Sequence, residues 1–384
     1  MPPNSVRTAV LVSASVASGW IGWSGHVLLL PLALAFPILW SLASSRWVAA
    51  AIAAGYFLSA SRGLPKGVAA YYQSDLWPGL ILWIVASLGF IMVHTMFWSR
   101  SRSRSAAGYL AASILMAVPP FGIVGWAHPI TAAGVLFPGW GWFGLAVTAA
   151  SLPALASRWR PAVALALMGA WLLSAMSWID PRVPDTWRGV DFALGASLGR
   201  EAGLLRQREL IAVVNRIAAG GVRRIVLPES ALGFWTPTVE RLWVSALHDT
   251  DITVVAGAAV VDAHGYDNVL VAITGEGAQV LYRERMPVPG SMWQPWRSAS
   301  GGARAHFFAN PVVELGSMRL APLICYEQLI TWPVVQSMLG HVDIVVAVGN
   351  GWWTQGTSIV DIQRASAIAW ATLFSKPLII SFNI

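Results

Sequence analysis

The feature that most constrains this chain is a series of long apolar segments filling its first half. Most reach the roughly 17–25 residues that a helix needs to cross a bilayer. Within residues 1–177, nine Lys and Arg accompany a single acid, Asp75, and 56% of the whole chain is hydrophobic. Such a composition is too apolar for an ordinary soluble protein. We therefore expect a membrane domain of about seven transmembrane helices over residues 1–177, at about 7–23, 27–43, 47–60, 77–98, 108–125, 131–156 and 161–177.

The loop charges predict an orientation for this membrane domain. Cytoplasmic loops of membrane proteins carry an excess of Lys and Arg. A cytoplasmic N-terminus leaves only Arg62 and Lys66 in the outer loops. An odd number of spans then places residues 178–384 on the periplasmic side of a bacterial inner membrane. The inner loops would hold Arg7, Arg46, Arg100, Arg102, Arg104, Arg158 and Arg160.

The basic run "SRSRSRS" at 99–105 has two readings. It is a short nucleic-acid patch, or it is a cytoplasmic loop that contacts anionic lipid. Its place between two predicted spans favours lipid, so we expect membrane lipids as partners and no direct binding of nucleic acid. A transporter is disfavoured, because an ion path usually needs ionisable residues within the membrane and Asp75 is the only acid there.

The second half, residues 178–384, has the periodicity of an α/β domain. Apolar strand-like runs alternate with amphipathic helical stretches, and this alternation is typical of layered α/β folds. We expect helices at 201–219, 238–249 and 357–374. The strands are expected in "VDFALGA", "RRIVLPES", "ITVVAGAAVV", "NVLVAITG", "QVLYRER", "RLAPLIC", "VDIVVAVGN" and "PLIISF".

Three of these strands are followed by a side chain that could take part in chemistry. Glu229 follows "IVLP", Cys325 follows "APLI", and Asn350 follows "IVVAVG". Sites in open α/β sheets form at the carboxyl ends of strands, where a Cys and a Glu can act as nucleophile and base. Cys325 is the only cysteine, and taken alone a buried thiol more often fills space. A single cysteine excludes a cysteine-based zinc cluster, and we expect no cofactor.

The combined motifs resemble those of the carbon–nitrogen hydrolase (nitrilase) superfamily, in the form used by apolipoprotein N-acyltransferases. "LPESALG" at 227–233, "LICYEQLI" at 323–330 and "GNGWW" at 349–353 follow the order of its blocks. The resemblance implies a nitrilase-like αββα sandwich after the membrane domain. It also implies that Glu229 is the base, that Cys325 is the nucleophile and that Glu327 is an acid shaping the site.

Two further stretches are similar to the TraB conjugal transfer proteins of rhizobial and Agrobacterium plasmids. These are "HPITAAGVLFPGWGWFGLA" at 128–146 and "ERMPVPGSMWQPW" at 284–296. This resemblance implies a role in conjugal plasmid transfer, with other envelope components of the conjugation machinery as partners. The chain ends at "ISFNI", before the closing strands and final span that the superfamily implies. A naturally short end and a truncated reading frame both fit.

One departure from the superfamily bears on the chemistry. The stretch "YRERMPVP" places Glu284 where the resemblance implies a lysine that stabilises an oxyanion, with Arg283 and Arg285 on either side. A carboxylate there would repel the oxyanion unless it were protonated. Two functions therefore stay open: a thioester-forming N-acyltransferase or amidase, and a conjugation protein whose acyltransferase-like domain is catalytically degenerate.

Overall fold

The computed structural model describes residues 3–124, 126–195, 203–296 and 302–384. By its internal contacts the chain forms two compact units. The first comprises Met1–Pro181, Leu329–Trp332 and Gly356–Ser375. The second comprises Arg182–Gln328, Pro333–Gln355 and Lys376–Ile384. Helix α13, Ile359–Leu373, thus packs with the first unit, although it follows strands of the second along the chain.

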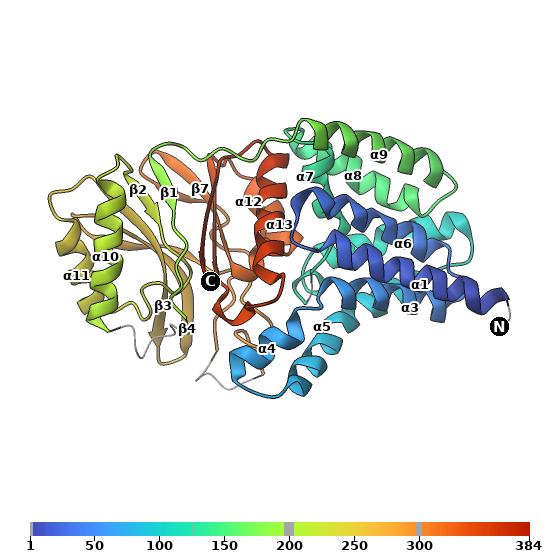
Figure 1. Ribbon diagram of the computed structural model, residues 1–384, viewed down its shortest axis with the longest axis horizontal. Helices are drawn as coiled ribbons and strands as arrows, with labels where there is room; N and C mark the ends of the chain where they lie inside the picture. Colours follow the sequence, from blue (N-terminus) through green and yellow to red (C-terminus); the bar gives the residue numbers. More distant parts are fainter. Residues whose placement is uncertain (1–2, 125, 196–202, 297–301) are drawn as a thin grey trace. The chain divides into compact units, whose positions relative to one another are not determined.

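The first unit is helical, as its apolar segments predict. Helix α1 packs against α3, and α5 packs against α3, α4 and α6; these helices lie beside one another in Figure 1. The elements are α1 Pro3–Gly22, η1 Val27–Leu34, α2 Ala35–Ser41, α3 Arg46–Ala60, α4 Leu64–Tyr72, α5 Leu76–Phe97, α6 Arg102–Ala117, η2 Phe121–Ile123, η3 Pro129–Ala132, α7 Ala133–Leu136, α8 Gly141–Leu155 and α9 Arg160–Met176, with α13.

Helix α13 approaches α7 so closely that a side chain at Gly134 has no room. A Cβ at Gly134 would lie 1.8 Å from the backbone oxygen of Ala369 on α13. Glycine therefore permits this backbone contact. The interior of the unit is aromatic, with the Phe36 and Tyr56 rings stacked at a centroid distance of 4.5 Å.

The lengths of the helices differ from the seven predicted spans. Among the described residues, one helix, Leu76–Phe97, is both long enough and apolar enough to cross a membrane by length and composition. The predicted spans 27–43 and 131–156 are each broken into shorter helical pieces. In the first of these spans, Pro31 lies inside the 3-10 helix η1, consistent with a residue that lacks the N–H an α-helix needs. Residue 125, at the end of the segment 108–125, lies outside the described residues.

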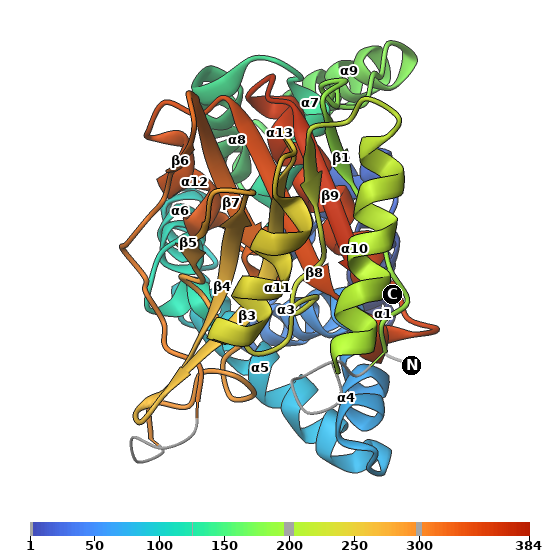
Figure 2. The ribbon, with the colours of Figure 1, turned by 90° about the vertical axis from the view of Figure 1, so that its left-hand side faces the viewer.

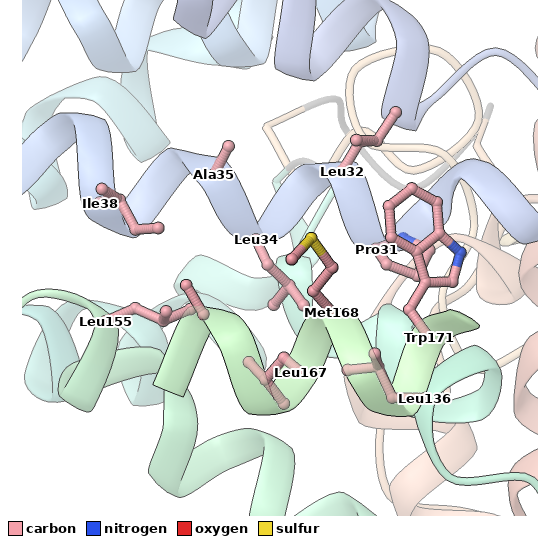
Figure 3. A pocket seen from close by; sticks show the side chains of 11 residues that line it. Pro31, Leu32, Leu34, Ala35, Ile38, Leu136, Leu155, Leu167, Met168 and Trp171 are labelled. Carbon is pink, nitrogen blue, oxygen red and sulfur yellow. The ribbon is translucent and has the colours of Figure 1, made fainter. Parts of the chain in front are cut away.

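An apolar cavity of about 240 Å³ lies within this unit. Figure 3 shows side chains of η1 and α2 facing those of α9 across it, including Leu34, Met168 and Trp171. None of the lining residues is ionisable, so the cavity offers no acid, base or nucleophile. The lining residues are Pro31, Leu32, Leu34, Ala35, Ile38, Leu136, Leu155, Ala164, Leu167, Met168 and Trp171.

The second unit contains two sheets. In the first, of order β1-β2-β3-β4-β5, β1, β2 and β3 are parallel and β4 and β5 antiparallel. In the second, of order β6-β7-β8-β9, β7, β8 and β9 are parallel. The strands are β1 Trp187–Gly189, β2 Arg224–Val226, β3 Thr253–Asp262, β4 Gly265–Ile273, β5 Ala278–Arg283, β6 Val313–Leu315, β7 Met318–Ile324, β8 Ile344–Asn350 and β9 Leu378–Asn383.

The two sheets pack face to face, and two helices cover the five-stranded sheet. Residues of both sheets, such as Leu270 and Val346, share one buried cluster. On the other face, α10 Leu204–Ala218 and α11 Pro237–Leu247 bury Val214 and Trp243 against β3 and β4. Figure 2 shows these helices in front of the strands. The remaining helical pieces are η4 Cys325–Gln328, α12 Thr331–Met338 and η5 Trp352–Thr354.

The predicted elements of this half are confirmed except near its beginning. Residues 201–202 of the predicted helix 201–219 lie outside the described residues, and its remainder contains α10. The predicted strand "VDFALGA" is wrong over residues 190–195, because β1 ends at Gly189. Its last residue, Ala196, lies outside the described residues. Beyond it the chain passes between sheets: Val190 N–H bonds the Val226 oxygen, and Phe192 N–H bonds the Phe382 oxygen of β9.

Candidate active site

Both sheets contribute to a buried group of polar residues around Cys325. Cys325 and Asn350 stand at the ends of the parallel strands β7 and β8. Glu229 follows β2, and Glu284 comes directly after β5. The structure thus brings together the thiol and the carboxyl that the sequence predicts as nucleophile and base.

Cys325 forms a tight elbow as the first residue of η4, directly after β7. Its φ of +46° lies in the left-handed region that non-glycine residues rarely adopt, at a cost of roughly 1–3 kcal/mol. Directly before it, the Ile324 N–H donates to Oε2 of Glu327 at 2.8 Å. The elbow therefore holds the thiol at the strand end, where the residue Cys325 is 6% exposed.

Glu229 lies in the loop after β2, directly above a glycine of the neighbouring strand. A Cβ at Gly257 of β3 would lie 2.5 Å from the Glu229 Cα. The carboxyl accepts a 2.8 Å hydrogen bond from Asn268 Nδ2 and is also hydrogen-bonded to Cys325. Burial raises its pKa to about 7, against the opposing effect of these hydrogen bonds. A base with that pKa exchanges protons readily near neutral pH.

Glu284 is fully buried beside Glu229. Its backbone N–H donates to the backbone oxygen of Asn268 at 2.8 Å, and its Oε2 accepts from Asn268 Nδ2 at 2.9 Å. One side-chain amide therefore links the two carboxyl groups. Burial, and then the charges of Glu229 and Glu327, raise the pKa of Glu284 well above its ordinary value.

Glu327 ties the cysteine elbow to the turn after β5. Its carboxylate accepts from the Tyr282 hydroxyl at 2.7 Å and from the backbone N–H groups of Arg285 and Met286 at 2.8 and 3.2 Å. Together with the bond from Ile324 N–H, these contacts occupy both of its oxygens. This arrangement suits a positioning residue that fixes Cys325 relative to Glu284.

The two arginines beside Glu284 are engaged elsewhere. Arg283 forms an ion pair with Asp267. Arg285 donates to the backbone oxygens of Pro322 and Pro333 and to the Ser337 hydroxyl. Both guanidinium groups thus have their own buried or half-buried partners, and neither forms an ion pair with Glu284.

Asn268 is the residue of this site that the sequence analysis missed. It lies within β4, opposite Ala259, directly before the apolar run Val269–Ile273. A buried amide in such a strand is itself a signal, because burying a polar group is costly unless it is hydrogen-bonded. Asn350, singled out in the sequence, accepts a 2.7 Å hydrogen bond from Asn383 through Oδ1. No metal-binding group of three or more His, Cys, Asp or Glu occurs among the described residues.

The variant Glu284→Gln should resist unfolding better than the wild type at neutral and alkaline pH. The folded chain keeps the Glu284 proton far above the ordinary pKa of 4.5, whereas the unfolded chain releases it there. Between those values the folded state binds more protons, so the free energy of unfolding falls as pH rises. Glutamine removes this contribution. The measurement is the thermal midpoint of the full-length protein in detergent at pH 5 and pH 8.

The matched control for this measurement is Glu209→Gln. Glu209 is exposed on α10, so its replacement should shift the midpoint equally little at both pH values. A stabilisation by Glu284→Gln that stays the same or shrinks between pH 5 and pH 8 would show that Glu284 is ionised in the folded protein.

A family model and two full-length relatives agree on one family for this chain. The carbon-nitrogen hydrolase family model matches residues 58–372. A probable conjugal transfer protein TraB of Sinorhizobium fredii is 62% identical over 100% of both chains. A conjugal transfer protein TraB of Agrobacterium fabrum is 56% identical, over 98% of this chain and 93% of its own. A solved amidase from Nesterenkonia sp. is 13% identical with a TM-score of 0.33, covering 45% of this chain and 68% of its own.

Proposed function

Because this chain belongs to the carbon-nitrogen hydrolase family, and within it to the TraB conjugal transfer proteins, we propose that it serves conjugal plasmid transfer as a thioester-forming enzyme. The observation that carries this proposal is the hydrogen bond between the Glu229 carboxyl and the Cys325 thiol. The left-handed elbow at Cys325 supports it, because backbone strain of this kind concentrates at functional sites.

The reaction uses the two groups in sequence. Ionised Glu229 takes the proton of the Cys325 thiol as sulfur attacks the carbonyl carbon of an ester or amide. Collapse of the tetrahedral intermediate expels the leaving group, which receives that proton, and a thioester remains on Cys325. An amine or water then takes the acyl group with Glu229 again acting as base. The outcome is an N-acyl transfer or an amide hydrolysis.

The test is acylation of the full-length protein in detergent micelles by p-nitrophenyl acetate. Because Cys325 is the only cysteine, a single acetyl group that hydroxylamine releases and that peptide mapping assigns to Cys325 reports a thioester there. We expect that adduct in the wild type. A protein that iodoacetamide alkylates at Cys325 but that never becomes acetylated there would instead have a degenerate site used as a scaffold.

The proposal includes the placement of the helical unit in the bacterial inner membrane, with membrane lipids around it. Support comes from the apolar helix α5 and from large apolar side chains exposed on α5 and α9, such as Ile81, Met92 and Leu173. Apolar surface of this extent is unfavourable in water and suits lipid. The loop arginines favour a periplasmic position for residues 178–384, where other envelope components of the conjugation machinery would be partners.

Topology can be tested with reporters fused after Ile384. Alkaline phosphatase at that position should be active and green fluorescent protein dark, because the first folds in the periplasm and the second in the cytoplasm. The reverse pattern would place the C-terminal domain inside. Recovery of the full-length protein from the soluble fraction would remove the membrane assignment altogether.

A further inference from the structure

The buried acid Glu284 stands where the superfamily resemblance implies a cation. It is 0% exposed, and none of the ion pairs among the described residues includes it. Of the two cations that flank it in sequence, Arg283 pairs with Asp267, and Arg285 lies 3.8 Å from Glu327. An isolated buried carboxylate is strongly unfavourable, so the group is far more stable with its proton.

One oxygen of Glu284 has a partner and the other does not. Oε2 accepts from Asn268 Nδ2, whereas Oε1 is buried and without a hydrogen bond. A carboxylic acid carries one O–H donor. Since Asn268 already donates to Oε2, the proton belongs on Oε1. A buried donor left without an acceptor is costly, unless a bound molecule supplies that acceptor.

The free oxygen lies in the group that holds the nucleophile. Asn268 Nδ2 donates to Glu284 and, at 2.8 Å, to Glu229, and Glu229 is itself hydrogen-bonded to Cys325. Glu327 fixes the turn that begins with Glu284 against the cysteine elbow through Arg285 N–H and Ile324 N–H. A carbonyl compound attacked by Cys325 therefore reacts close to the Glu284 acid.

We propose that Glu284 acts as a neutral carboxylic acid whose O–H donates a hydrogen bond to the oxyanion of the tetrahedral intermediate. It thereby replaces the expected lysine; this inference rests on the thioester chemistry proposed above. As the Cys325 sulfur bonds to the carbonyl carbon, the π electrons move to oxygen, and the Glu284 proton stays on its own oxygen throughout. Glu229 alone moves the thiol proton.

This assignment makes the site sensitive to alkaline pH. The titratable groups that face Glu284 are the carboxyls of Glu229 and Glu327. Glu229 is hydrogen-bonded to Cys325. Glu327 is bound by Tyr282 and Arg285, which also contact each other. Burial, and then the charges of Glu229 and Glu327, hold the proton on Glu284. Once alkaline pH removes it, the new carboxylate repels the oxyanion, and acylation falls. At lower pH the acylation rate is limited by the ionisation of Glu229, which must lose its proton to act as the base.

The test compares two reactions of Cys325 in the full-length protein. Alkylation by iodoacetamide forms no oxyanion, whereas acetylation by p-nitrophenyl acetate does. We expect Glu284→Ala to slow acetylation about 10²–10³-fold, the usual loss when one oxyanion donor is removed. Alkylation should stay within a fewfold of the wild type. Glu284→Gln, whose amide N–H is also a donor, should retain most of the acetylation rate. Its acetylation rate should no longer decrease at alkaline pH.

Three outcomes are decisive. Acetylation that is unchanged or faster in Glu284→Ala, with alkylation unchanged, would overturn this inference and leave the thioester chemistry standing. Absence of acetylation in the wild type would overturn the thioester chemistry and this inference with it. An unchanged alkaline fall in Glu284→Gln would assign that limb to another group and also contradict the inference.

A spectroscopic measurement keeps the inference testable if Glu284→Ala fails to fold. The infrared difference spectrum between wild type and Glu284→Gln at pH 7 should contain the carbonyl band of a protonated carboxylic acid. The matched control is the difference spectrum between wild type and Glu209→Gln, at an exposed position on α10, which should contain a carboxylate band instead. A carboxylate band for Glu284 as well would rule out the neutral donor.

Discussion

A donor strain whose protein carries Cys325→Ala will lose plasmid transfer to the level of a strain without the gene. Removing the nucleophile of an acyl-transfer enzyme costs about 10⁶-fold in kcat, so no useful turnover remains. Cys325 is 6% exposed at a strand end, and alanine retains the Cβ there. The measurement is the number of transconjugants per donor, together with the amount of full-length protein in the membrane fraction.

Ile344→Val is a suitable control for this experiment. Ile344 begins β8 and belongs to the same buried cluster as Cys325, but it has no group able to do chemistry. Its truncation costs about 0.5–1.5 kcal/mol and should leave transfer intact. If Cys325→Ala donors transfer plasmids at the wild-type frequency with normal protein levels, the thiol is dispensable and the domain serves assembly.

Glu229→Gln will slow the reaction of Cys325 with both p-nitrophenyl acetate and iodoacetamide by about 10²–10⁴-fold, the usual contribution of a general base. Glutamine can still accept the hydrogen bond from Asn268, so the loop should keep its place. In the wild type, both rates should rise as pH increases through about 7, because the base acts only when ionised. In the variant that step disappears. Stopped samples analysed by intact mass give the rates.

The comparison for Glu229→Gln is Glu209→Gln, which removes an exposed carboxyl from α10 and should leave both rates unchanged. The circular dichroism spectrum of Glu229→Gln should match the wild type. Equal rates in Glu229→Gln and wild type across pH 5 to 8 would show that another group takes the thiol proton. Unchanged alkylation with slower acetylation alone would move Glu229 from base to substrate contact.

Much of the second unit could be predicted from the sequence because its strands are short apolar runs bounded by turn residues. The runs "ITVVAGAAVV" and "VDIVVAVGN" became β3 and β8 nearly residue for residue. The segment after Gly189 could not, since its hydrogen bonds go first to β2 and then to β9. Residues 190–192 form such bonds without continuing a strand. The local pattern of apolar residues cannot predict that the hydrogen-bond partner changes from one sheet to the other.

In the first unit the sequence predicted the kind of element but not its length. Its apolar segments predict helices, and helices are present, yet several are shorter than a span. Pro31, for example, lies inside the 3-10 helix η1 within a predicted span. The association of α13 with this unit includes the close contact between Gly134 and Ala369. These residues are too far apart in the sequence for any local pattern to link them.

The sequence alone determined the candidate nucleophile and base, because Glu229 and Cys325 each follow an apolar strand in a recognisable block. It also showed an acid at position 284. Only the tertiary structure decided the protonation state of that acid. Glu284 is buried out of contact with water, and its neighbours are Asn268 from β4, Glu229 from the β2 loop and Glu327 from η4. A carboxyl's proton depends on its solvation and neighbouring charges, which folding assembles from segments separate along the chain.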